Sequence, residues 1–405
     1  MESGRTRGGG AADAVVVGGG TVGAWCAVFL RRSGLDRVVL VEAGALGQGA
    51  SSRAAGIVRS QGGTPTAVRL AEWSRAFYLS QYDEPGVDSG FVRQGYYLPC
   101  FTEEDIATAR ARLAMQQGLG QAVRWIDADE AEARNPTLAQ GSTLGGTFLD
   151  DDGYIHPPRN VLAYTAALRS SGVEVLEHTT FEGLETSGDR VVGVRTSRGP
   201  IATGAVVLTG GPQLADVGAR AGTRIPAGGV RHQVAVTAPH ADLDPSRVPM
   251  VFDVQAGLYW RPEEGGLLFG MSNPDEPPGE ATEIDWPYLA RIRTRLAELV
   301  PVTRTLGLRR VWAATIDYTP DHFPILGPAL GPDGPVLGTV VASAGGHGMM
   351  WGPGVSRAAA DLVLTGSTDV VDVGPLGLDR FDEHGVSRLD PDPIALPFPE
   401  RTTLT

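Results

Sequence analysis

The stretch that decides the fold is AVVVGGGTVGAWCAVFLRRSGLDRVVLVE, residues 14–42. Its first four residues form a short run rich in valine, and residues 38–41 form a second one; both patterns favour buried strands. A glycine-rich turn and a helix-like segment, residues 24–32, lie between them, and Gly34 ends the helix. Strand, GxGxxG turn, helix, strand and acid follow in order. This order predicts a Rossmann-type dinucleotide-binding unit.

The three glycines of the turn have separate roles. Gly18 permits the tight turn, Gly20 lets the backbone approach a pyrophosphate, and Gly23 lets the helix pack closely against the sheet. The pyrophosphate is expected at the helix N-terminus, beside Thr21 and Val22, where free N–H groups and the helix dipole favour an anion. A bare GxGxxG is weak evidence in a chain with 55 glycines, so the prediction depends on the complete unit.

The acid that closes the second strand narrows the choice of dinucleotide. Glu42 stands where a carboxylate accepts hydrogen bonds from the adenosine ribose hydroxyls, and Ala43 follows it at the same edge. The carboxylate would repel the 2′-phosphate of NADP. NAD and FAD remain open from this unit alone.

Composition excludes several classes of function. The 405 residues include 47 acidic and 34 basic ones, and the formal net charge of −13 disfavours nucleic acid and anionic membranes as partners. No apolar run reaches the ~18–20 residues of a membrane span. Residues 1–12 lack the pattern of a signal peptide, so we expect a disordered tail and a cytoplasmic protein.

The reactive residue types narrow the chemistry further. All 34 basic residues are arginine, which excludes a lysine Schiff base and a lysine general base. Cys26 and Cys100 form neither a disulfide framework nor a zinc cluster. His347 has no second histidine at ligand spacing, so we predict no metal.

The loop after the second strand separates FAD from NAD. It reads GQGASSRAAG, residues 47–56, and with the preceding unit it resembles the D-amino-acid oxidase-like flavoprotein superfamily. The resemblance implies FAD, with this loop wrapping the pyrophosphate and the ribityl chain; a solvated Ser/Gly loop is the alternative. The residues it assigns to these contacts are Gly49, Ser51, Ser52, Arg53, Ala55 and Gly56.

Two further segments match the same family in the same order. Residues 173–207 read as short strands separated by turns and lead into AVVLTGG at 205–211. TPDHFPILG at 319–327 precedes AGGHGMM at 344–350 and a helix over 355–364. The resemblance covers residues 13–367 and implies that this helix aims its N-terminus at the flavin pyrimidine. The cofactor contacts it implies are Val175, Gly210, Gly211, Gly346, His347, Gly348, Met349 and Met350.

The fold class that follows is α/β (α+β), a Rossmann-type FAD-binding domain with a second domain of antiparallel β-sheet plus helices. The first domain is expected to be discontinuous, at residues 13–60, 160–224 and 316–367. The substrate domain takes residues 61–159 and 225–315, with helical patterns at 66–79, 103–117 and 286–299 and strand patterns at 230–237 and 267–271. Residues 368–405 are rich in proline and aspartate and are expected to be a tail strapped on the surface.

The resemblance also implies a reaction. In the relatives the flavin takes a hydride from the carbon next to an amine nitrogen of a secondary amine or amino acid, and the product is an imine. Such a donor must present its nitrogen lone pair, so only the neutral amine reacts and the rate should rise with pH. The electrons then pass to O₂ or another acceptor.

Five residues are the candidates for the substrate side. Arg59 matches an arginine beside the substrate in monomeric sarcosine oxidases, and Arg261 is a second candidate for holding a carboxylate. Tyr259 and His232 could line the same cavity, whereas His347 lies in the Gly-His-Gly turn against the flavin. A surface ion pair for the arginines and core packing for the rings are the alternatives.

Four positions depart from the relatives. Ile316 falls near the position where the glycine oxidase branch has its carboxylate-binding arginine, and Met350 about where sarcosine oxidases have a lysine. Ala314 replaces a cysteine that attaches FAD covalently in those oxidases, so FAD should be non-covalent. Leu268 stands near the position of the lysine that speeds their reaction with O₂, so we expect slow reoxidation by O₂ and hence a dehydrogenase.

Two other functions stay open from the sequence. The flavin could oxidise a hydroxy acid or another non-amine substrate. The chain could also be a non-catalytic flavin-binding assembly protein.

Overall fold

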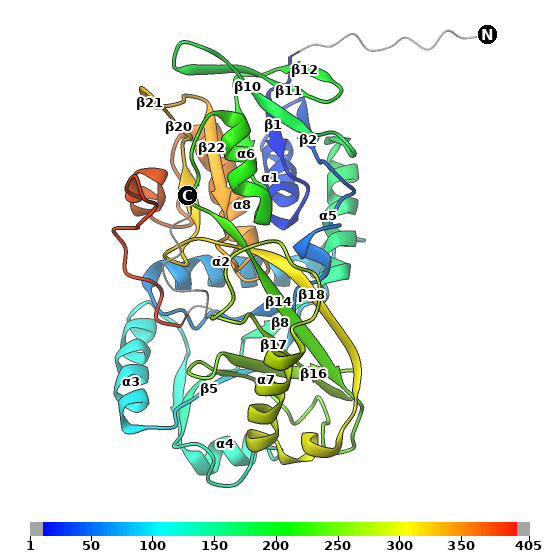
Figure 1. The fold of residues 1–405 in the computed structure, drawn as a ribbon, viewed down its shortest axis with the longest axis vertical. Coiled ribbons are helices and arrows are strands. Elements are labelled where there is room, and N and C mark those ends of the chain that lie inside the picture. The colour runs from blue at the N-terminus through cyan, green and yellow to red at the C-terminus, as the bar shows by residue number, and fades with distance from the viewer. Residues whose placement is uncertain (1–10, 395–405) are drawn as a thin grey trace, which may run out of the picture.

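The structure is a computed structural model that describes residues 11–394. Two domains are stacked along its long axis (Figure 1). The first is built on a six-stranded sheet in the order β19-β22-β13-β1-β2-β9, parallel except for β19. In that order its strands are Ile325–Gly327, Thr339–Ser343, Val206–Leu208, Ala14–Val17, Val38–Val41 and Glu174–Leu176. The predicted Rossmann-type architecture is confirmed.

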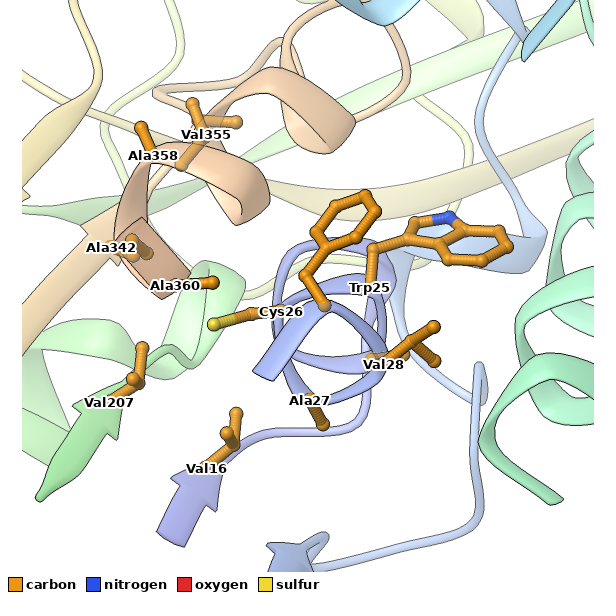
Figure 2. Close-up of a cluster of buried hydrophobic side chains, with 14 of the residues drawn as sticks. Val16, Trp25, Cys26, Ala27, Val28, Val207, Ala342, Val355, Ala358 and Ala360 are labelled. Carbon is orange, nitrogen blue, oxygen red and sulfur yellow. The ribbon is translucent and has the colours of Figure 1, made fainter. Parts of the chain in front are cut away.

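Helices α1 (Thr21–Arg32) and α8 (Gly352–Thr365) pack on this sheet, and α5 (Pro157–Ser171) packs against α1. Figure 2 shows Cys26 of α1 beside Ala360 of α8, above the strands that carry Val16 and Val207. The small residues of α1 and α8 let the two helices approach closely, which fixes the N-terminus of α1 at the edge of the sheet.

Helix α2 (Pro65–Ser80) corrects the predicted domain boundaries. Residues 61–159 were assigned to the substrate domain, but the core of the first domain includes Leu70 and Ala71 of α2, and Phe77 packs edge-on against Trp25 at 4.9 Å. The helix therefore belongs with the nucleotide-binding domain. The boundary at residues 315 and 316 also falls inside one strand, β18 (Leu308–Tyr318), which belongs to the second sheet.

The second domain has an eight-stranded sheet in the order β18-β14-β17-β16-β15-β5-β7-β6. The strands after β18 are Gly228–Thr237, Gly266–Met271, Leu258–Glu263, Met250–Asp253, Tyr96–Pro99, Gly146–Leu149 and Arg124–Ile126. The sheet is antiparallel as expected, except that β15 and β5 pair in parallel. The second domain also contains helices α3 (Glu103–Gly118), α4 (Ala128–Arg134) and α7 (Trp286–Leu299). The bounds of α7 are those predicted from the sequence.

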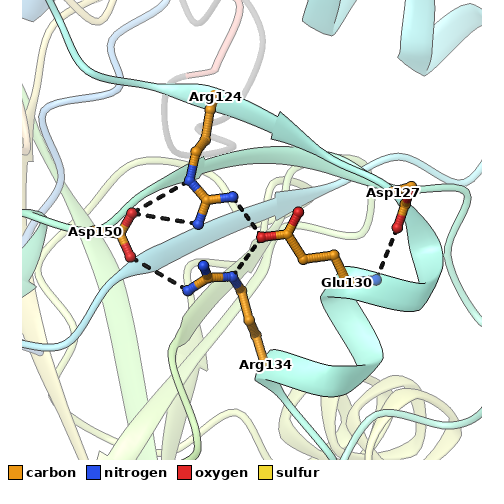
Figure 3. Close-up of polar contacts among 5 residues, drawn as sticks. All are labelled: Arg124, Asp127, Glu130, Arg134 and Asp150. Carbon is orange, nitrogen blue, oxygen red and sulfur yellow. Dashed lines mark hydrogen bonds and ion pairs between the residues drawn. The ribbon is translucent and has the colours of Figure 1, made fainter.

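A network of charged side chains lies at the outer edge of this domain (Figure 3). Glu130 accepts from Arg124 at 2.6 Å and from Arg134 at 2.8 Å, and both arginines also reach Asp150. Asp127 caps α4 by accepting from the Glu130 backbone N–H. These side chains are 33–60% exposed, so each pair contributes little to stability and the network lies outside the chemistry below.

Smaller elements complete the chain. Strands β10 (Phe181–Ser187), β11 (Arg190–Thr196) and β12 (Gly199–Ala202) form a separate sheet, followed by α6 (Leu214–Ala221). Strands β3 (Ile57–Val58), β8 (Gly153–Tyr154) and β4 (Val92–Arg93) form another, and β20 (Leu330–Gly331) pairs with β21 (Gly334–Pro335). Among the described residues, no helix is long and apolar enough to cross a membrane.

The two predicted tails need correction. Ala12 is buried and bridges Thr203, so the ordered part begins before residue 13. Residues 368–394 do not simply lie on the surface: Arg380 is buried and paired with Asp321 at 2.7 Å, and Ile394 is fully buried in the core of the second domain. These contacts are non-local, so a Pro- and Asp-rich composition could not reveal them. Residues 1–10 and 395–405 lie outside the described part.

Candidate active site

A cavity of about 440 Å³ runs from the glycine-rich turn of the first domain to the sheet of the second. Most of the predicted cofactor residues line it. They are Gly18, Gly20, Thr21, Val22, Gly23, Glu42, Ala43, Gly49, Ser51, Ala55, Gly56, Gly210, Gly211, Gly346, His347, Gly348, Met349 and Met350. Segments far apart in the sequence therefore meet at one site.

The glycine-rich turn is shaped by steric need. Gly18 has φ +101°, a conformation that L side chains rarely adopt, and a Cβ on Gly23 would overlap the carbonyl oxygen of Gly18. Helix α1 starts at the N-cap Gly20, which makes no side-chain capping bond. The Thr21 amide donates to Ser51, whereas Val22 and Gly23 of the same turn line the cavity, where a phosphate can accept from their amides.

Glu42, which directly follows β2, lines the cavity. Its carboxylate accepts from the backbone N–H of Gly19 at 2.6 Å and of Gly44 at 2.7 Å. The two bonds fix the side chain at the end of β2, and carboxylate oxygens have enough lone pairs to accept a hydroxyl as well. This geometry fits a ribose.

The loop at residues 47–56 contributes less than expected. Ser51 lines the cavity and accepts from both the N–H and the hydroxyl of Thr21 at 3.0 Å. Ser52 and Arg53 do not line the cavity: Ser52 turns back toward the Gly49 carbonyl, and Arg53 donates to carbonyls of its own loop. Their expected role as donors to the cofactor is not supported, because local backbone acceptors hold both side chains.

Val175 also lies outside the cavity lining. It is the central residue of β9 and pairs with Leu40 of β2. Thr179 and Thr180, which follow β9, line the cavity at this level instead. The valine was placed by resemblance alone, and no local pattern marks the threonines.

The segment before α8 forms another part of the cavity wall. His347 stacks on Trp351 at 4.0 Å, and its Nδ1 lies 3.0 Å from the Gly345 carbonyl. Burial, together with Arg59, lowers the pKa of His347 to about 3, so the ring is neutral at ordinary pH. Asp317 was missed by sequence reasoning although it stands beside the TPD motif. It lines the cavity, accepts from the Ser343 hydroxyl at 2.9 Å, and has a pKa raised by burial.

Arg59 lines the cavity and is 4% exposed. Its Nη1 donates to the Gln61 carbonyl at 2.5 Å and its Nη2 to the Ile394 carbonyl at 2.9 Å. The guanidinium also lies over the ring of Phe252, 5.6 Å from its centroid. Within residues 11–394, Arg59 has no carboxylate within ion-pair distance. A buried cation held by neutral groups is a strong candidate for binding a ligand carboxylate.

His232 and Tyr259 meet on the sheet of the second domain, and both line the cavity. His232 Nε2 is 2.7 Å from the Tyr259 hydroxyl, and its Nδ1 is 2.9 Å from the Ser272 hydroxyl. Burial lowers the pKa of His232 to about 4 and raises that of Tyr259, so both side chains are uncharged at neutral pH. Tyr96 and Phe252, which sequence reasoning missed, complete this aromatic end.

Arg261 does not lie in the cavity. Its Nε donates to the Ala55 carbonyl at 3.0 Å, and its Nη1 pairs with Glu263 at 2.6 Å. The guanidinium therefore joins the sheet to the loop and has its charge neutralised within the protein. Alternation along a strand could not distinguish it from a residue that faces the cavity.

The parallel sheet, its glycine-rich turn and a cavity that continues onto a second sheet define a dinucleotide-binding protein with a separate substrate domain. The chain belongs to the FAD-dependent oxidoreductase family, because the family model described as FAD dependent oxidoreductase (DAO) matches residues 13–362. FAD is therefore the cofactor, and the cradle described above fits it.

Several known proteins are similar over most of the chain. It is 30% identical over 389 residues to 4-methylaminobutanoate oxidase (formaldehyde-forming) of Paenarthrobacter nicotinovorans, covering 92% of this chain and 46% of the relative. It is 30% identical over 379 residues to glycine oxidase of Geobacillus kaustophilus, covering 91% and 97%. The structure of L-proline dehydrogenase from P. horikoshii superimposes with a TM-score of 0.84 at 25% identity, covering 91% and 97%.

The first curated relatives are longer proteins. The chain spans 46% of 4-methylaminobutanoate oxidase and 44% of human dimethylglycine dehydrogenase, about half of each.

Proposed function

We propose that this protein oxidises the carbon next to the nitrogen of an amine that carries a carboxylate, giving an imine that water hydrolyses. The observation that carries the proposal is Arg59, a buried cation without a carboxylate partner within residues 11–394, at the cavity end opposite the glycine-rich turn. The names of the relatives, which include oxidases and dehydrogenases of glycine, proline and methylated amines, support the amine.

The residues of the chain would act in two ways: they would bind the substrate, and they would keep anions away from its amine nitrogen. Bound FAD supplies the hydride acceptor. Arg59 would hold the carboxylate and so fix the reacting carbon, while the hydroxyl of Tyr259 would be available to the nitrogen. Because His232 and Tyr259 are neutral, the cavity offers no anion there to stabilise an ammonium, which favours the reactive free amine.

Anaerobic reduction of the flavin tests the proposal. N-methyl-phenylalanine and N-methyl-2-phenylethylamine, which lacks only the carboxylate, should both bleach the FAD absorbance, the first at lower concentration. 2-Hydroxy-3-phenylpropanoate should not. Bleaching by the hydroxy acid alone would favour hydroxy-acid oxidation, and no bleaching by a broad panel would favour a non-catalytic flavoprotein.

The electron acceptor is a separate part of the proposal. Leu268 is buried between β14 and β16 and does not line the cavity, and the chain has no lysine to supply a cation near the flavin. We therefore expect slow reoxidation by O₂ and an acceptor other than oxygen. Stopped-flow mixing of the reduced enzyme with O₂ decides this; fast reoxidation would make it an oxidase.

A further inference from the structure

The segment at residues 389–394 lies against the substrate arginine, although it is more than 300 positions away from it in the sequence. The Ile394 carbonyl accepts from Arg59 Nη2 at 2.9 Å, and the Ile394 side chain is fully buried in the hydrophobic core of the second domain. The family model matches residues 13–362, so this contact lies outside the range that the family model describes.

Asp392 anchors the segment. Its carboxylate is buried and accepts from the Ile394 backbone N–H at 2.9 Å and from the Gly63 backbone N–H. A Cβ on Gly63 would overlap the Asp392 carboxylate and Pro393, so a glycine is required where the two backbones meet. Because Gly63 follows Arg59 by four residues, one contact fixes both the segment and the loop that carries the arginine.

Among the described residues, the carboxylates of Asp392 and Asp152 both lie within the electrostatic field of Arg59, but neither forms a direct ion pair with it. Arg59 and Arg112 both favour the ionised form of Asp392, while burial outweighs them and raises its pKa. The carboxylate thus lies within the field of the substrate arginine but bonds to backbone amides. Its position leaves the guanidinium to be oriented by neutral carbonyls, and an incoming carboxylate does not have to displace an anion.

We propose that residues 389–394 support the substrate site from behind Arg59, outside the cavity lining, and that Asp392 is a positioning residue that holds Arg59 in the geometry that binds a substrate carboxylate. The inference rests on the proposed function, since it assumes that Arg59 receives a carboxylate. A displacement of the guanidinium by about 1 Å is enough to lose most of a charged, oriented contact.

The test measures carboxylate preference by binding, so it does not depend on turnover. The probes are 3-phenylpropanoate and its neutral match 3-phenylpropanamide, and dissociation constants are read from the visible flavin spectrum of the holoenzyme. We expect the wild type to prefer the carboxylate by at least about 30-fold and Arg59→Met to lose that preference. Asp392→Ala should lower the preference for the carboxylate about tenfold. Asp390→Ala, the same change at an exposed neighbour, should leave the preference unchanged.

A double variant separates positioning from general loss of structure. In the Arg59→Met background, Asp392→Ala should change the preference no further, because the residue acts through the arginine. Full preference in Asp392→Ala, an equal loss in Asp390→Ala, or a further loss in the double variant would overturn the inference. A wild type without carboxylate preference would overturn it as well, while bleaching of the flavin by amines would still support amine oxidation.

Discussion

We expect His232 to lower the free energy of unfolding by about 2 kcal/mol when the pH falls from 8 to 5, and His232→Asn to remove this loss. His232 is 6% exposed, and both ring nitrogens bond to neutral hydroxyls, those of Ser272 and Tyr259. Burial lowers its pKa from 6.5 to about 4. Protonation would place a cation among aromatic rings with no anion bonded to it.

The sign follows from proton linkage. Between pH 6.5 and about 4 the unfolded chain binds the proton and the folded one does not, so stability falls as the pH falls through this window. At about 1.4 kcal/mol per pKa unit, the full shift amounts to roughly 3 kcal/mol, of which roughly 2 kcal/mol has been lost at pH 5. Carboxylates with a raised pKa, such as Asp152 and Asp317, act in the opposite direction, so only the difference between variants isolates the histidine.

Urea unfolding at saturating FAD, followed by tryptophan fluorescence at pH 8 and pH 5, measures the effect. His232→Asn should lower the free energy of unfolding at pH 8, because the new side chain fits the site less well, but it should flatten the dependence on pH. His384→Asn is the matched control, since that ring is 70% exposed, and its pH dependence should equal that of the wild type. A His232→Asn protein with the wild-type slope would refute the reasoning.

Three further outcomes follow from the geometry. Gly23→Ala should abolish retention of FAD through gel filtration, because the new Cβ has no room, while Gly118→Ala, with open space around it, should retain the cofactor. Arg380→Gln should cost about 3–5 kcal/mol in urea unfolding because it leaves a buried carboxylate unpaired, against about 0–1 kcal/mol for Arg357→Gln in a half-exposed helix pair. Arg59→Met should lower kcat/KM for N-methyl-phenylalanine about 30-fold or more and leave N-methyl-2-phenylethylamine within a few-fold; equal losses for both would contradict a role in carboxylate binding.

Structural features that depend on residues close together in the sequence could be predicted. The helix at 286–299 has an Asp N-cap, a proline in its first turn and a regular apolar spacing, and all three are local. The turn around Gly18 and Gly23 was equally clear, because steric rules demand glycine at those positions. Family resemblance predicted that the segments at 205–211 and 344–350 contact the same cofactor, and residues of both segments line one cavity.

What could not be predicted depends on contacts between distant segments. Arg59 and Arg261 have the same residue type and similar burial, but only the first faces the cavity; the second finds Glu263 two positions along its own hairpin. Ser52 and Arg53 had suitable chemistry and point elsewhere because nearby carbonyls hold them. The burial of Ile394 has no sequence signal, since its partners come from the middle of the chain.

Three arginines of the part of the chain that the structure describes, Arg59, Arg261 and Arg380, are buried, and they differ in what surrounds the charge. Arg261 pairs with Glu263 and Arg380 with Asp321, so both charges are neutralised within the fold. Arg59 is equally removed from water but, within residues 11–394, bonds only to carbonyl oxygens. A buried cation without a bonded anion lowers the stability of the folded state. A ligand that supplies a carboxylate would pair with Arg59 and remove this cost, so the lost stability would contribute to the free energy of binding. The residue that destabilises the free protein is therefore the one expected to select the ligand.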